Sequence, residues 1–299
     1  MKKAPVYVVL LIATCLPFEP RAVAGERACP ATQKFAEGVA STGAWDWRVT
    51  FVPSGRQMYW ARTGTFWPAT RERAAIQTAH RAGRAWAAPE VASFSGVHSD
   101  IDPALSPNGR YLVFSSERPR PDGKATQMDL WRVERNGNDW GEPVHLGDTV
   151  NSAGDELYAS VDRSGALYFA SNRDGEFDIY RSTPVSGGGY AAAEKLPGLV
   201  NTAQRWEFNP EISPDGRTVL FVRLDLPDAL PDQGYGLGDI YVSRLGADGF
   251  DEPVNLGPCV NSKQDEFHPT VMWQRKRLFF ARNLGVNSDF YALPLDLPR

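Results

Sequence analysis

The chain has 299 residues, of which 42% are hydrophobic, 11% aromatic and 23% charged, and its formal net charge is −4. This composition is ordinary for a globular protein and excludes collagen, a low-complexity tail and a disordered chain. The mildly acidic balance disfavours a nucleic-acid partner, because nucleic-acid binders usually carry a basic surface.

The first segment has the pattern of a secretory signal peptide. Lys2 and Lys3 precede an apolar run at residues 6–16, and small residues at 22 and 24 provide a cleavage site before Gly25. The apolar run is shorter than the ~20 residues that a membrane span needs. An uncleaved anchor helix and a lipid on Cys15 are the alternatives, and Thr14 fits a lipid-attachment motif poorly. We therefore expect a signal peptide at residues 1–24 and a periplasmic or secreted protein without a membrane span.

Cleavage would remove Cys15 and leave Cys29 and Cys259. Two cysteines in an oxidising compartment can form a disulfide, which would tie the new N-terminus to a late loop. Two free buried thiols are the alternative, because the sequence does not show that the two sulfur atoms meet.

One turn recurs along the remaining chain. Its clearest copies are residues 106–110 (SPNGR) and 213–217 (SPDGR), with weaker copies at 53–56 and 162–165. The glycine supplies the positive φ that a tight hairpin needs. An aromatic-rich strand follows each turn, and a fifth such strand at 278–280 follows residues that have lost the glycine. An Asp-apolar-aromatic strand and a segment that ends near Val-Asn complete the unit, as in residues 178–180 and 196–201.

The units repeat about every 50 residues with four short strands each, which is typical of propeller blades. The chain is therefore predicted to be an all-β propeller of four-stranded antiparallel blades. We count five blades, with six as the alternative because the first unit is degenerate. The fifth unit has three strands, and residues 35–42 resemble the missing fourth one. We expect residues 25–44 to supply the strand that closes the ring and residues 45–299 to form the propeller. A short helix at 32–40 is the alternative.

The SPNGR and SPDGR turns, the phenylalanine after them and the Asp-Ile-Tyr strand resemble the TolB-type propeller repeats of exported bacterial proteins. The resemblance covers nearly the whole chain after residue 44 and implies the fold, whereas propellers carry unrelated functions. TolB itself has an additional N-terminal α/β domain. Only about twenty residues separate the signal peptide from the first unit, so we do not transfer the TolB role in envelope integrity.

Each unit carries one acidic residue near the start of its first strand. These residues are Asp46, Asp100, Glu156, Glu207 and Glu266. Because first strands line the central channel of a propeller, the five carboxylates are predicted to ring one channel mouth. They are candidates for binding Ca²⁺, another cation or a cationic ligand. The alternative, which we prefer, is pairing with the arginines that follow the aromatic of each second strand, because buried charges are usually paired. These arginines are Arg62, Arg118, Arg173, Arg223 and Arg282.

Three further residues near this mouth are candidates for ligand binding. His268 follows Glu266 by two residues and should lie on the same strand face, where it could act in acid–base chemistry. His98 precedes Asp100, and Trp206 could stack on a sugar or a peptide or pack between blades. No nucleophile elbow, P-loop or dinucleotide motif is present. An irregular insert from Leu224 to Gly238 could cover part of the ring.

Three hypotheses about function remain open. The first is an exported, monomeric, non-catalytic propeller that binds an envelope protein, a peptide or a glycan at the channel mouth. The second is a glycoside hydrolase or lyase that uses two channel carboxylates. The third is a scaffold stabilised by Ca²⁺, and no other cofactor is expected. Arginine pairing of every ring acid would argue against the enzyme. An unpaired acid of raised pKa that faces a cleft near His268 would favour it.

Overall fold

The computed structural model describes residues 29–65, 72–123, 127–225 and 238–298. Within these ranges the chain consists of β-strands, turns and one 3₁₀ turn, η1 (Trp273–Arg275). The expected signal peptide and residues 226–237 of the expected insert lie outside the described residues.

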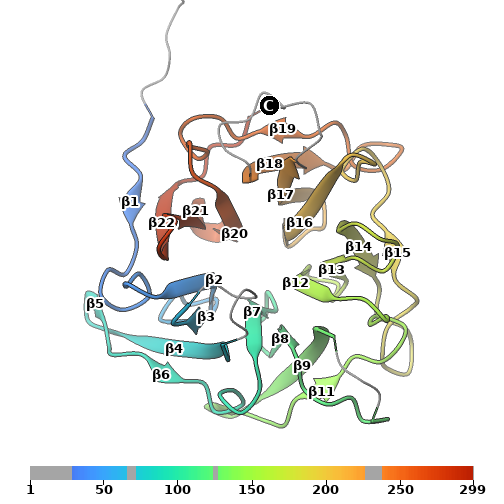
Figure 1. The fold of residues 1–299 in the computed structure, drawn as a ribbon, viewed down its shortest axis with the longest axis horizontal. Helices are drawn as coiled ribbons and strands as arrows, with labels where there is room; N and C mark the ends of the chain where they lie inside the picture. The colour runs from blue at the N-terminus through green and yellow to red at the C-terminus, as the bar shows by residue number, and fades with distance from the viewer. Residues whose placement is uncertain (1–28, 66–71, 124–126, 226–237, 299) are drawn as a thin grey trace, which may run out of the picture.

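The strands follow one another in five groups around a central axis (Figure 1). Pairing within each group is antiparallel, and a single parallel pair, Trp45 with Ser288, joins the first group to the last in one sheet. We call the groups blades and number them in chain order. Blade 1 contains β2 (Trp45–Phe51), β3 (Gln57–Thr63), β4 (Ala75–Ala82), β5 (Ala85–Trp86) and β6 (Glu90–Val91). Blade 2 contains β7 (Asp100–Leu105), β8 (Tyr111–Ser116), β9 (Asp129–Asn136), β10 (Asp139–Trp140) and β11 (Val144–His145). Blade 3 contains β12 (Glu156–Val161), β13 (Leu167–Ser171), β14 (Asp178–Ser182) and β15 (Glu194–Lys195). Blade 4 contains β16 (Arg205–Ile212), β17 (Thr218–Asp225), β18 (Gly238–Arg244) and β19 (Val254–Asn255). Blade 5 contains β20 (Glu266–Met272), β21 (Arg277–Asn283), β22 (Ser288–Pro294) and β1 (Gln33–Lys34).

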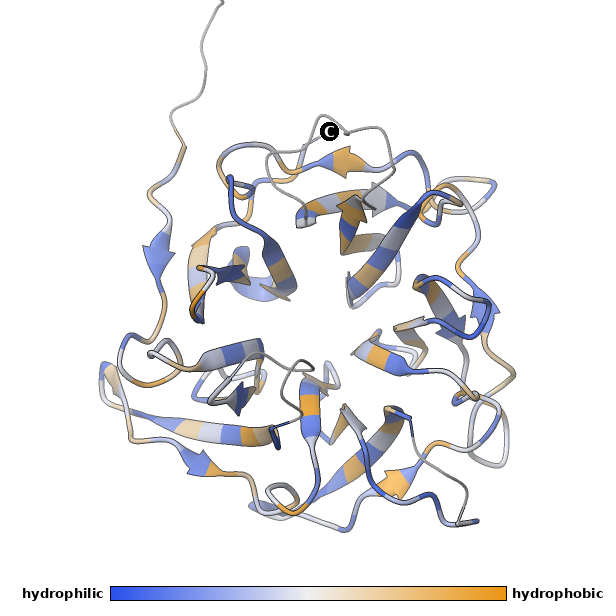
Figure 2. Cartoon of the chain, viewed as in Figure 1, coloured by the Kyte–Doolittle hydropathy of each residue, from blue (hydrophilic) through white to orange (hydrophobic). Residues whose placement is uncertain are grey.

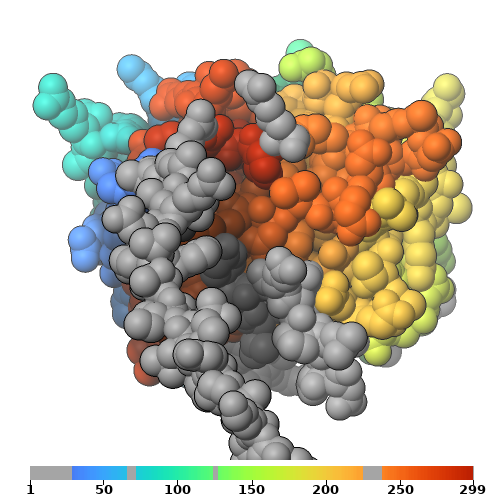
Figure 3. Space-filling view, turned by 90° about the horizontal axis from the view of Figure 1, so that it is seen from above, coloured from blue at the N-terminus to red at the C-terminus, as the bar shows by residue number. Residues whose placement is uncertain are grey.

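The two ends of the chain meet in blade 5. Strand β1 pairs antiparallel with β22, with Lys34 opposite Tyr291, and the Cys29–Cys259 disulfide fastens the segment before it. Figure 3 shows these N-terminal residues in blue beside the red C-terminal blade. The closing strand lies just before the segment expected from sequence, residues 35–42, which instead forms the turn into blade 1. There the Ser41 hydroxyl accepts the Phe290 N–H and donates to the Phe35 carbonyl, and no helix forms.

The hydrophobic core lies between neighbouring blades. Each second strand contributes at least one aromatic residue that is fully buried, at matching positions: Trp60, Phe114, Phe169, Phe221 and Phe280. Figure 2 shows polar and apolar residues alternating in bands along strands such as β16 and β20. Burying one such aromatic side chain contributes roughly 1.5–3 kcal/mol, so the repeated aromatic accounts for much of the contact between blades.

The recurring turn connects the first and second strands of each blade. In SPNGR and SPDGR the glycines, Gly109 and Gly216, have φ near +70° and donate their N–H to the serine carbonyl. The last copy has no glycine. Lys276 takes the left-handed position there with φ of 48°, and η1 precedes it. The turn geometry therefore persists where its sequence signal is lost.

Candidate functional site

The five predicted ring acids are fully buried, and each forms an ion pair with an arginine on or just after the second strand of its own blade. The pairs are Asp46–Arg62 at 2.6 Å, Asp100–Arg118 at 2.9 Å, Glu156–Arg173 at 3.0 Å, Glu207–Arg223 at 3.0 Å and Glu266–Arg282 at 2.5 Å. These are the five arginines that the sequence offered as partners.

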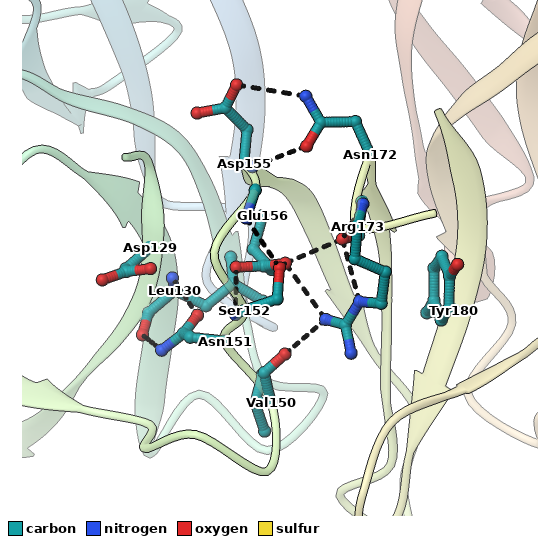
Figure 4. A network of polar contacts seen from close by, with 12 residues as sticks. Asp129, Leu130, Val150, Asn151, Ser152, Asp155, Glu156, Asn172, Arg173 and Tyr180 are labelled. Atoms are coloured by element: carbon teal, nitrogen blue, oxygen red, sulfur yellow. Dashed lines mark hydrogen bonds and ion pairs between the residues drawn. The ribbon is translucent and has the colours of Figure 1, made fainter. Parts of the chain in front are cut away.

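Each arginine and acid also hold the chain segment that arrives from the preceding blade. In blade 3, shown in Figure 4, Arg173 donates to the Val150 carbonyl at 2.6 Å while Glu156 accepts the backbone N–H of Ser152 at 2.8 Å. The same carbonyl contact is made by the other four arginines, to Val39, Phe94, Val200 and Val260. We call this repeated arrangement of acid, arginine and incoming segment the blade latch.

Burial and the latch contacts act in opposite directions on the pKa of the ring acids. Burial raises the pKa of all five carboxyl groups above its ordinary value, and the charge of the arginines together with hydrogen bonds from serine or threonine offsets only part of this rise. For Glu207 the balance brings the pKa to about 7. Arginine occupies the place that a cation or a ligand would need beside each carboxylate. In this geometry each ring acid is paired within its own blade, and no group of three or more His, Cys, Asp or Glu residues in the described ranges is arranged to hold a metal ion.

A second layer of side chains lies two residues further along each inner strand. There a bulge shifts the pairing register with the second strand, and the residue has a positive φ although it is not glycine. The residues are Arg48 (φ 32°), Asp102 (55°), Tyr158 (60°), Asn209 (52°) and His268 (53°). A bulge re-aims a side chain, and a positive φ costs such residues roughly 1–2 kcal/mol each. We call these five residues the channel layer.

Side chains of the channel layer contact one another across the ring. The Asn209 carbonyl oxygen accepts the backbone N–H of His268 at 3.1 Å, which orients the Asn209 amide to donate to His268 Nδ1 at 3.2 Å. The His268 ring also packs edge-on against Trp47 and Tyr158, with centroids 5.8 and 5.4 Å apart. Burial lowers the pKa of His268 well below its usual 6.5, and Arg48 lowers it further, so the imidazole is neutral at pH 7.

The channel layer and Glu211 next to it together contain two buried carboxyl groups and one buried guanidinium group. Arg48 donates to Glu211 Oε2 at 3.0 Å and to the Pro210 carbonyl, across the channel from its own blade. Asp102 is 1% exposed, and neither of its carboxylate oxygens has a hydrogen-bond partner of ordinary geometry. Its Oδ1 atom lies 3.5 Å from His268 Nδ1. Burial raises the pKa of both Asp102 and Glu211 to about 7, and Arg48 opposes the shift in each.

Asp102 and His268 line a cavity of about 180 Å³ on the ring-acid side of the channel layer. Its other walls are mostly aromatic or aliphatic. The lining residues are Trp47, Ile101, Tyr158, Phe177, Trp206, Phe208, Asn209, Leu224 and Phe267. A compact apolar site with a few convergent polar groups is the usual form of a small-ligand site, so we take this aromatic pocket as the candidate functional site.

The structure separates the residues that the sequence grouped together. His268 and Trp206 line the aromatic pocket, and Trp206 also donates to Glu176. His98 is half-buried and does not line the pocket. His268 and Glu266 were expected to share a strand face, but the bulge gives them separate partners. Sequence analysis missed Asp102, although it stands at the same offset from Asp100 as His268 from Glu266.

Solved structures with a similar fold include proteins of different activities. A Bacteroides ovatus protein described as xyloglucan PUL GH43B is 13% identical with a TM-score of 0.55, over 88% of this chain and 54% of its own. Trypanosoma rangeli sialidase is 10% identical with a TM-score of 0.50, over 89% of this chain and 60% of its own. A protein described as TolB from Agrobacterium tumefaciens is 15% identical with a TM-score of 0.49, over 84% and 74%. No protein-family model and no curated protein matches the chain. The similarity establishes the propeller fold, as predicted, and no activity.

The described part of the chain contains no helix that is long and apolar enough to cross a membrane.

Proposed function

We propose that this protein is an exported, non-catalytic propeller that binds a peptide or a protein segment in the aromatic pocket at the channel mouth. The observation that carries the proposal is the pocket itself, which has aromatic walls and a floor of three polar side chains, Asp102, Asn209 and His268. The Cys29–Cys259 disulfide supports export, because disulfides persist in oxidising compartments.

The shape of the pocket favours a peptide over a glycan. A cavity of about 180 Å³ is close to the ~150 Å³ cavity that holds one benzene ring, so it accommodates one side chain. A glycan presents several hydroxyl groups to each sugar-sized site, and hydroxyls buried without partners cost roughly 1–3 kcal/mol each. The few polar groups of the pocket suit a ligand with one polar end.

A carbohydrate-active enzyme is the second candidate, and one observation favours it. Asp102 is a buried acid with a pKa of about 7 beside His268, in a pocket. Glycoside hydrolysis, however, needs two carboxyl groups about 5–9.5 Å apart. Among the described residues Asp102 is the one acid that lines the pocket, and the ring acids are held in the latches.

Tryptophan fluorescence tests the proposal, because Trp47 and Trp206 lie in the pocket wall. The protein is titrated with tripeptides of the form X-Gly-Gly and Gly-X-Gly, where X is Phe, Leu or Ser, and with cellotetraose. We expect saturable changes with Phe and Leu peptides, weaker ones with Ser peptides and cellotetraose, and intact ligands by mass spectrometry. Trp206→Leu should weaken binding, and Trp140→Leu, on β10 outside the pocket, should not. Cleavage of any ligand, or saturable binding of cellotetraose alone, would refute the proposal.

A further inference from the structure

The buried groups around the aromatic pocket leave one carboxyl group, that of Asp102, without a hydrogen-bonded cation. Asp102 and Glu211 are two buried carboxyl groups, and Arg48 is the one buried cation beside them in the described residues. Arg48 hydrogen-bonds Glu211 and the Pro210 carbonyl and makes no hydrogen bond to Asp102. Burying an unpaired carboxylate costs free energy, so we expect either a proton on Asp102 or a second cation beside it.

His268 does not supply that cation. Its Nδ1 accepts a hydrogen bond from the Asn209 amide, whose orientation is set by the His268 backbone N–H. A nitrogen that accepts from Asn209 has no proton to donate to Asp102, 3.5 Å away. The Tyr158 backbone N–H is close enough to favour the charged form of Asp102 without completing a hydrogen bond of ordinary geometry.

The walls of the pocket suit an organic cation better than a metal ion. Aromatic rings attract ammonium groups through the negative potential of their faces, by about 0.5–2 kcal/mol for each favourable contact. Hard metal ions require several oxygen ligands, and the pocket offers the Asp102 carboxylate and the Asn209 amide between Trp47, Phe208 and Phe267. The volume of about 180 Å³ limits the rest of the ligand to a single ring or a short branched chain.

We propose that the aromatic pocket recognises an ammonium group carried on a compact aromatic or branched aliphatic body, with Asp102 as its counter-ion. This inference rests on the proposed function and specifies which end of a ligand enters. Such an ammonium group can belong to a free amine or to the N-terminal residue of a peptide.

Isothermal titration calorimetry at pH 7.5 tests the counter-ion with matched probes. Phenethylamine, phenethyl alcohol and phenylacetate have similar size and carry positive, zero and negative charge. We expect phenethylamine to bind at least ten-fold more tightly than the alcohol, and phenylacetate not to bind. Equal affinity for the amine and the alcohol would overturn the inference and would indicate a water or a proton at Asp102. This comparison needs only the wild-type protein.

A variant pair then assigns the preference to Asp102. Asp102→Asn should remove the advantage of the amine over the alcohol, leaving their affinities within about two-fold. Asp248→Asn makes the same charge change on an exposed loop between β18 and β19 and should leave the advantage intact. Retention of the advantage in Asp102→Asn would refute the role of this residue.

Peptide probes distinguish a free amine from a peptide N-terminus as the ligand, and they test ammonium recognition separately from peptide binding. Phe-Gly-Gly binding at least ten-fold more tightly than acetyl-Phe-Gly-Gly supports a peptide N-terminus. Binding of phenethylamine with no binding of either peptide supports a free amine and contradicts the peptide as the ligand of the proposed function. Equal binding of the two peptides, unaffected by Asp102→Asn, contradicts the ammonium inference and leaves peptide binding standing.

Discussion

The blade latch of blade 4 provides a direct test of the architectural role of the ring acids. In this latch Glu207 is fully buried, Arg223 is 6% exposed, and their atoms are 3.0 Å apart. Arg223→Met would leave the Glu207 carboxylate buried without its cation, which typically costs about 3–5 kcal/mol. It would also remove the hydrogen bond to the Val200 carbonyl and the stacking on Phe221, each worth roughly 1 kcal/mol. We therefore expect the free energy of unfolding to fall by about 5–7 kcal/mol.

The measurement is denaturant unfolding at pH 8, where Glu207 is charged. Glu207→Gln keeps the shape of the side chain, and the double variant Glu207→Gln/Arg223→Met removes both charges. The free energy of unfolding of the double variant should fall by about 2–3 kcal/mol less than the sum of the two single-variant losses, because neither charge is then buried without its partner. Glu134→Gln is the control, since the Glu134 side chain is 57% exposed and that of its partner Arg132 is 30% exposed, and ion pairs in contact with solvent contribute less than about 1 kcal/mol.

Two results would refute this reasoning. Additive losses in the double variant would mean that the ion pair does not couple the two residues. Loss of ligand binding in Glu207→Gln with unchanged stability would restore the acid ring as a ligand site and remove its architectural role.

Two further predictions concern the ring closure and the channel layer. Cys29→Ser/Cys259→Ser should lower the free energy of unfolding by roughly 2–5 kcal/mol, since the bridge joins residues 230 apart; equal unfolding midpoints with and without a reductant would contradict this. The pKa of Asp102 rises from 3.8 to about 7 on folding, so the folded protein holds this proton more tightly, and the wild type loses stability as pH rises from about 4 to 7. Asp102→Asn has no carboxyl group at this position and lacks this loss. The free energy of unfolding of the variant minus that of the wild type should therefore rise by roughly 2–3 kcal/mol between pH 5 and 8, and parallel pH profiles of the two proteins would contradict the assignment. His268 titrates in the opposite direction, and its contribution is common to both proteins.

The sequence predicts the fold because the same local chemistry recurs in each blade. The glycine turn, the buried aromatic and the Asp-apolar-aromatic strand each have a physical cause that acts within a few residues. The latches are predictable from sequence for the same reason, because Glu207 and Arg223 lie opposite each other on the paired strands β16 and β17. The closing strand was misplaced by a few residues because its pairing with β22 involves only two residues, Gln33 and Lys34, which carry no apolar pattern.

The aromatic pocket was not predictable in the same way, because it depends on the bulges. Strict alternation places an acid and the residue two positions later on one face of a strand. In the structure the register shift separates them, so that Asp100 lies in a latch and Asp102 lies in the channel layer. The bulge residues include arginine, tyrosine and histidine with positive φ, which local sequence preference disfavours. Backbone strain that local sequence does not favour persists only where the surrounding structure holds it, and such strain gathers at functional sites. Five of the seven non-glycine residues with positive φ in the described part of the chain lie in this one layer beside the pocket, and this is the strongest structural reason to look for function at Asp102 and His268.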